Sequence, residues 1–207
     1  MSLWKTCAFA LACLVAAAAP ARAADPAAQT IQSFYNSLLD TMKHGPQLGM
    51  QGRYRALEPA VDATFDIPAM IQFIVGPRWS SMSAQDKSAL TTAFRRMTVA
   101  NYAANFQKYD GEQFNVDPNV QQRGPDKLVQ TTLAAPGQKP IPLVYRMRNT
   151  SGSWKVIDVF LEGYVSELAT RRSDFAATLA SGGATALIAK INQLSDNLLS
   201  GTAKSAP

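Results

Sequence analysis

The hydrophobic residues of this chain change their spacing twice, and this change constrains the fold more than any other feature. From residue 31 to about 109, apolar side chains recur every three or four positions, which is the period of an amphipathic α-helix. From 114 to 161 they alternate with polar residues, as in a β-strand. Helical spacing returns from 168 to 198. This order predicts an α+β fold with helices packed on one face of a curved sheet.

Caps and breakers divide the helical regions into separate helices. Asp66 is placed to cap one helix, and Ser83-Ala84-Gln85-Asp86 resembles a capping box for the next. Asp110-Gly111 and Gly182-Gly183 are expected to end two others. The helices are expected over 31–42 (closed by Lys43-His44-Gly45-Pro46), about 48–61, 67–74, the stretch from Ser83 to Tyr109, 168–179 and 187–198.

The middle of the chain predicts strands. Its turns are rich in Asp, Asn, Pro and Gly and are short enough for an antiparallel meander of about four strands. With no repeat or linker, we expect a single α+β domain over 24–200 and a frayed tail over 201–207. The strands are expected at about 114–120, 128–133, 141–147 and 154–161.

The N-terminus has the three parts of a secretory signal peptide. Lys5 gives a positive start, residues 6–19 are almost wholly apolar, and Pro20-Ala21-Arg22-Ala23 fits cleavage after Ala23. The apolar run is shorter than the ~20 residues that span a membrane. The alanine-rich signal looks bacterial, so we expect cleavage of 1–23 and a periplasmic protein. No later segment is long and apolar enough to span, so we expect the mature chain to be soluble.

The expected mature chain has little reactive chemistry. Removal of 1–23 takes away both cysteines, Cys7 and Cys13, and two basic residues, leaving a net charge of +3. The single histidine, His44, is expected to interact with a helix dipole. There is no metal-ligand spacing and no nucleotide-binding loop, so neither a metal nor a cofactor is expected. The basic residues are dispersed, which argues against nucleic acid as a partner.

Several motifs, taken in order, resemble the MlaC family, also called the toluene-tolerance or Ttg2 family of ABC-transporter auxiliary proteins. The resemblance spans about 65–195. The stretch 154–163 is similar to the family signature W-K-V-x-D-V-x-x-E-G, and Arg172-Ser173-Asp174-Phe175 matches its R-S-x-F helix. Tyr164-Val165, between Gly163 and Ser166, departs from the usual pattern. The run from Ser166 to Phe175 looks more like the hopanoid-associated HpnM branch.

The resemblance implies an NTF2-like fold and a periplasmic lipid carrier without enzyme activity. Such a protein holds a phospholipid or a hopanoid in an apolar cavity and shuttles it between membranes. The implied partners are an inner-membrane ABC transporter with an MCE-domain protein, and an outer-membrane lipid complex or an RND-type exporter.

Apolar strand residues and two facing side chains are our candidates for the cavity wall. Arg146 and Arg148 share a strand face and could attract an anionic head group or a partner surface, although solubility explains them equally well. The predicted lipid-binding residues are Met70, Phe106, Leu143, Tyr145, Met147, Val156 and Phe160.

The sequence is also compatible with two other functions. Asp158 interrupts an apolar strand, and a half-buried carboxylate in a curved-sheet cavity could act as a base. An NTF2-like isomerase or hydratase could then use Asp158 or Tyr145. More often such a carboxylate pairs with an arginine or caps backbone amides. The second alternative is a periplasmic adaptor with a filled core that binds no ligand, since periodicity does not distinguish a cavity from packing.

Overall fold

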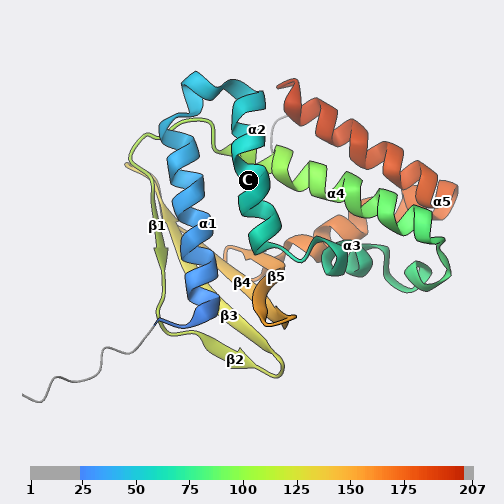
Figure 1. The fold of residues 1–207 in the computed structure, drawn as a ribbon, viewed down its shortest axis with the longest axis horizontal. Coiled ribbons are helices and arrows are strands. Elements are labelled where there is room, and N and C mark those ends of the chain that lie inside the picture. Colours follow the sequence, from blue (N-terminus) through green and yellow to red (C-terminus); the bar gives the residue numbers. More distant parts are fainter. Residues whose placement is uncertain (1–23, 203–207) are drawn as a thin grey trace, which may run out of the picture.

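The computed structural model of the protein describes residues 24–202 (Figure 1). The predicted signal peptide and residues 203–207 of the predicted tail lie outside the described residues. Figure 1 shows a twisted sheet with α1 laid across one face, and α2 to α5 grouped beside it. The helices are α1 (Pro26–Lys43), α2 (Gly45–Thr64), α3 (Ile67–Val75), a short 3₁₀ helix (Gly76–Ser81), α4 (Ala84–Asn105) and α5 (Glu167–Leu199).

Local capping explains where these helices begin. The side chain of Asp25 accepts a hydrogen bond from the Ala27 amide at 2.9 Å, and Pro26 occupies the first helical turn, so α1 begins five residues before Ile31. Asp66 and Ser83 cap α3 and α4, as the sequence predicted.

Helix α4 is shorter than the sequence predicted. It ends at Asn105 rather than near Tyr109, because Phe106 has non-helical backbone angles (φ −111°, ψ 69°). The apolar spacing that suggested a longer helix continues into a loop, where Phe106 still packs against the core.

The sheet is antiparallel throughout, in the order β1-β3-β4-β5-β6, with β2 also paired to β3. The four predicted strands are present, and two short strands, β2 and β6, extend the sheet. Helices lie on one face of it, which confirms the predicted α+β fold. The strands are β1 (Gln113–Val116), β2 (Gln121–Arg123), β3 (Asp126–Ala134), β4 (Ile141–Thr150), β5 (Ser153–Leu161) and β6 (Val165–Ser166).

A β-bulge in β5 sets which side chains face the helices. Arg146 pairs with Asp158, whereas the next residue of β4, Met147, pairs with Val156, so Ile157 is an extra residue. An extra residue reverses the alternation of side chains along the strand. We call the side that packs on α1, with Leu143, Tyr145, Met147, Val156, Val159 and Leu161, the inner face. The outer face then carries Val144, Arg146, Asp158 and Phe160.

Helix α1 closes part of the inner face through a buried polar contact. The hydroxyl of Tyr35 lies 2.7 Å from the Thr131 hydroxyl and donates to the Tyr145 hydroxyl at 3.0 Å. The Tyr35 ring packs on Phe114 of β1 at 4.5 Å between centroids. These contacts fix the position of α1 on three strands.

Helix α5 consists of two helical segments joined at Gly183. This residue has φ 61° and ψ −153°, a conformation that is essentially restricted to glycine. The kink agrees with the predicted interruption at Gly182-Gly183. Among residues 24–202, no helix combines the length and apolarity needed to cross a membrane.

We expect Gly183→Ala to destabilise the protein by about 1–3 kcal/mol, because a β-carbon strains this backbone conformation although no neighbour blocks it. Ser181→Ala is the matched control, since Ser181 is exposed in regular helix and its replacement should change stability by less than about 0.5 kcal/mol. Urea unfolding measures both. Equal stability of the two variants would contradict a glycine-dependent kink.

Candidate functional site

The inner face that α1 leaves uncovered forms the floor of a large cavity. Its volume is about 750 Å³, within the range of small-molecule sites. Helix α4 and both segments of α5 supply its walls. The apolar lining comes from Tyr35, Leu38, Phe65, Met70, Phe94, Met97, Tyr102, Phe106, Phe114, Leu133, Ile141, Leu143, Tyr145, Val159, Leu161, Val165, Leu168, Leu194 and Leu198; the other lining residues are Thr98, Asn101, Asn105, Glu162, Glu167 and Arg171.

Hydrogen-bonded tyrosines stiffen the deep wall. Tyr145 contacts the hydroxyl of Tyr35 and is also hydrogen-bonded to Tyr102. Burial raises the pKa of Tyr35 to about 12 and that of Tyr145 well above its usual value. These hydroxyls therefore stay protonated at neutral pH and act as hydrogen-bonding groups rather than as proton carriers.

The charged lining residues gather at one end of the cavity. Glu162 follows β5, and Glu167 and Arg171 lie one turn apart at the start of α5. This end is the opening, because the lining residues Ile141 and Val165 are each 40% exposed here. The deep lining residues, such as Tyr35 and Leu38, are buried.

Glu167 is the partly buried carboxylate of this opening. Its side chain is 26% exposed, and the closest Arg171 nitrogen lies 3.9 Å from its Oε2. Burial raises the pKa of Glu167, Arg171 lowers it, and the carboxylates of Asp158 and Asp174 raise it further.

The structure brings four of the predicted lipid-binding residues together. Met70, Phe106, Leu143 and Tyr145 line the cavity. Met147 and Val156 also lie on the inner face, but both are fully buried in closed packing outside the cavity. The α2–α3 connection covers that end of β5, where the Asp66 amide donates to the Val156 carbonyl at 2.9 Å. Contact of the four lining residues with lipid stays a prediction.

The predicted position of Phe160 needs correction. Phe160 lies on the outer face, opposite Val144, whereas its neighbours Val159 and Leu161 line the cavity. Simple alternation from Val156 placed it in the cavity wall, but the extra residue Ile157 moves it to the other side.

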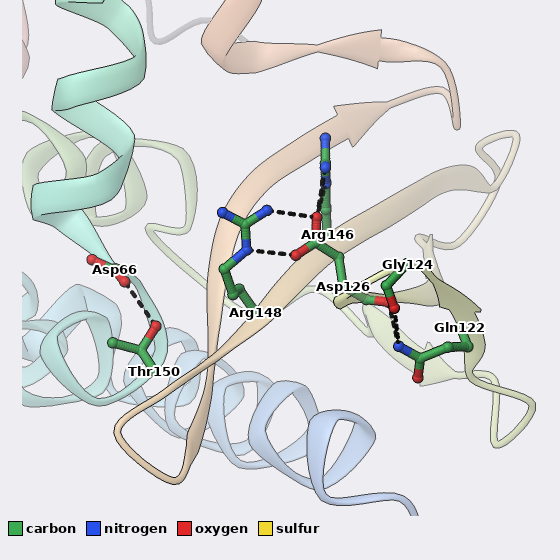
Figure 2. Close-up of polar contacts among 7 residues, drawn as sticks. All are labelled: Asp66, Gln122, Gly124, Asp126, Arg146, Arg148 and Thr150. Carbon is green, nitrogen blue, oxygen red and sulfur yellow. Dashed lines mark hydrogen bonds and ion pairs between the residues drawn. The ribbon is translucent and has the colours of Figure 1, made fainter.

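The predicted arginine patch is also outside the cavity. Figure 2 shows Arg146 and Arg148 converging on Asp126, which is fully buried. The Nε of Arg146 donates to Asp126 Oδ2 at 2.7 Å, and Arg148 donates to both carboxylate oxygens at 2.6 and 2.9 Å. The two arginines thus join β4 to the start of β3, and their guanidinium groups are partly engaged. A role in binding a partner stays a prediction.

Asp158 anchors the start of α5. Its carboxylate accepts hydrogen bonds from the Ser166 hydroxyl at 2.7 Å and from the amides of Val159 at 2.8 Å and Leu168 at 3.3 Å. It lies on the outer face and is not a lining residue. The capping interpretation of this residue is therefore the one the structure supports.

Sequence reasoning missed most of the α4 and α5 walls. Phe94, Met97 and Tyr102 carried helical spacing, which predicts buried packing as readily as a cavity. A usable signal was the set of polar residues Thr98, Asn101 and Asn105 along the same helix, because all three line the cavity. Glu167 and Arg171 gave no signal beyond an ordinary i, i+4 pair.

A curved sheet cupped by helices around one large apolar cavity defines the class: an α+β protein with a ligand-sized internal cavity. The sequence profile of the MlaC protein family matches residues 32–193, and the chain belongs to the MlaC family. No curated protein matches the sequence. The chain is similar in structure to the phospholipid-binding protein from Ralstonia solanacearum, solved in complex with a phospholipid. The two share 20% identity and a TM-score of 0.74, over 84% of this chain and 99% of the other.

Two arginines hold the buried carboxyl of Asp126 in its charged form. Burial alone would raise the pKa of its carboxyl, but the hydrogen bonds from Arg148 and Arg146 outweigh burial and lower it. Such a carboxyl stabilises the fold above its unfolded pKa of about 3.9, and this stabilisation is lost as pH falls through the folded pKa. Asp126→Asn should therefore lower the free energy of unfolding by about 2 kcal/mol at pH 7. This is less than the loss expected on breaking a fully buried ion pair, because both arginines are partly exposed.

The difference between wild type and Asp126→Asn should shrink below about pH 4. Asp110→Asn is the control, since Asp110 forms an exposed ion pair with Lys108 and its loss should cost less than about 1 kcal/mol. Denaturant unfolding at pH 3 and pH 7 measures both variants. An equal cost of Asp126→Asn at the two pH values would contradict the ion cluster as its source.

A pair of truncations separates closed core from cavity wall. Met147→Ala should cost about 3 kcal/mol, because it removes a fully buried side chain. Leu143→Ala should cost about 1 kcal/mol, since Leu143 already borders the cavity on one side. Unfolding of lipid-free protein tests this order, and a larger cost for Leu143→Ala would show that the cavity wall is misplaced.

Proposed function

We propose that this protein is a periplasmic lipid carrier. It holds the hydrocarbon part of one lipid in the cavity and leaves the polar head at the charged opening. The observation that carries this proposal is the 750 Å³ cavity, which is lined mainly by apolar side chains and has its charged groups at one end.

The cavity volume suits the hydrocarbon of a single lipid. A water molecule takes about 30 Å³ of liquid volume, and a methylene group is of similar size, so 750 Å³ has room for roughly 25 such groups. A two-chain lipid has about 30 methylenes, whose transfer from water is worth ~0.8 kcal/mol each, or ~24 kcal/mol in total. The two sizes are of the same order, so in this proposal the tails of one lipid fill the cavity and the head lies at the opening.

Burial on this scale makes release slow unless another protein assists it. A ligand is released on demand only when a second state of the carrier holds it less tightly. We therefore propose that lipid exchange depends on docked partners. The partners we propose are an inner-membrane ABC transporter with an MCE-domain protein, and an outer-membrane lipid complex or an RND-type exporter.

Three observations support binding over catalysis. The chain belongs to the MlaC family, and a protein of similar fold was solved with a phospholipid. Asp158 is held on the outer face by α5. Tyr145 has a pKa raised well above its usual value, whereas an acid–base catalyst needs a pKa near the working pH.

The lipid is a phospholipid or a hopanoid in this proposal. The phospholipid-bound relative in fold supports the first. The resemblance of the run from Ser166 to Phe175 to the HpnM branch supports the second. Both lipids present the same combination of a bulky hydrocarbon and a small polar end, which matches the cavity and its opening.

The test is to block the cavity without disturbing the fold. Leu143→Trp places a larger side chain in the cavity and should lower lipid occupancy at least tenfold. Val144→Trp is the matched control, because it makes a similar change at the next residue on the outer face. Native mass spectrometry of protein from its natural host measures bound lipid, and extraction identifies it.

Full lipid occupancy in Leu143→Trp would place the lipid elsewhere and contradict the proposed site. Wild-type protein that carries no lipid, and takes up none from vesicles, would contradict the carrier function itself.

A further inference from the structure

The opening of the cavity has an excess of negative charge. Glu162 and Glu167 face it from the β5–α5 connection, and Arg171 is the single cation among the described lining residues. Asp158 and Asp174 lie close enough to raise the pKa of Glu167. An anionic head group would therefore meet more repulsion than attraction here.

Among the residues that the structure describes, no cation lies within charge-assisted hydrogen-bond distance of Glu167. Its contact with Arg171, at 3.9 Å, is longer than the 2.7–2.9 Å of a charge-assisted hydrogen bond. Its side chain is about three-quarters buried, so water can hydrate the carboxylate only in part. A partly desolvated carboxylate in this position is stabilised by a ligand that brings its own positive charge.

We propose that the opening selects lipids whose polar end carries a primary ammonium group, and that Glu167 is the carboxylate that contacts it. This inference rests on the proposed function as a lipid carrier. An ammonium offers three donors, enough to bond Glu167 while it remains hydrated on its outer side. Arg171 lies one helical turn from Glu167, where it is placed to meet the phosphate of a zwitterionic phospholipid.

Two kinds of lipid supply this chemistry. One is a zwitterionic phospholipid with an ethanolamine head, and the other is a polycyclic hydrocarbon that ends in an amine. The shared feature is the ammonium group, so each kind is compared with a counterpart of the same hydrocarbon that lacks it.

The experiment is a competition for lipid-free protein. Vesicles contain equal amounts of ethanolamine-headed and glycerol-headed phospholipid with identical chains, and mass spectrometry gives the ratio bound. Wild type should prefer the ethanolamine head about fivefold, the effect expected of a partly exposed ion pair. Glu167→Gln should bring the ratio close to one. A second arm compares amine-ended with hydroxyl-ended polycyclic lipid. The arm with the larger preference for ammonium shows which of the two kinds of lipid the protein carries.

Two variants control for other effects. Glu58→Gln removes a carboxylate of similar exposure (32%) that pairs with Arg95 outside the cavity, and the wild-type ratio should persist. Arg171→Gln removes the cation of the opening and should increase the preference for ammonium, because the excess of negative charge at the opening grows. Thermal unfolding verifies that each variant folds.

Equal uptake of both heads by wild type in both arms would overturn the inference and leave the carrier function intact. An unchanged preference in Glu167→Gln would overturn the role of Glu167. Uptake of neither lipid would overturn the carrier function and, with it, this inference.

Discussion

One extra residue in β5 determines how the inner face of the sheet is divided. Before the bulge, Val156 pairs with Met147 under the α2–α3 connection, in closed packing. After it, Val159 and Leu161 pair with Tyr145 and Leu143 and form the cavity floor. If Ile157 were paired regularly instead of bulged, alternation from Val156 would turn Asp158 and Phe160 inward and place a carboxylate and a bulky ring where the floor now lies. The bulge therefore gives an apolar floor and places Asp158 on the outer face, where it anchors α5.

A cavity of this size needs walls that do not collapse, because protein interiors normally pack to the density of organic crystals. The tyrosine contacts from α1 supply part of that resistance, since Tyr35 is held by both Thr131 and Tyr145. Ring contacts continue this wall: Phe34 packs edge-on against Tyr102 at 5.0 Å, and Tyr102 stacks on Phe106 at 6.0 Å. Directional contacts hold these side chains at fixed separations, whereas aliphatic chains would slide together.

Much of the fold could be predicted from the sequence, because periodicity and capping are local properties. The helices, the four main strands and the caps at Asp66 and Ser83 follow from residues that lie close together in the chain. The position of the bulge depends on pairing between strands, so alternation alone misplaced Phe160. The α4 wall was equally hidden, since an apolar helix face looks the same whether it meets a core or a cavity. The position of the opening at Glu167 and Arg171 depends on where α5 packs against the sheet, and this packing cannot be predicted from a local sequence pattern.

Every charged lining residue in the described part of the chain lies at the opening, and this position determines the order of events during transfer. A lipid held as proposed has its tails deepest, so the tails enter first and leave last. In a bilayer the opposite end of the lipid faces an approaching protein, since the head lies at the water surface. Direct uptake from a leaflet would thus require the molecule to turn end over end. A donor that presents the acyl chains before the head removes that requirement, and an acceptor must receive the head before the chains.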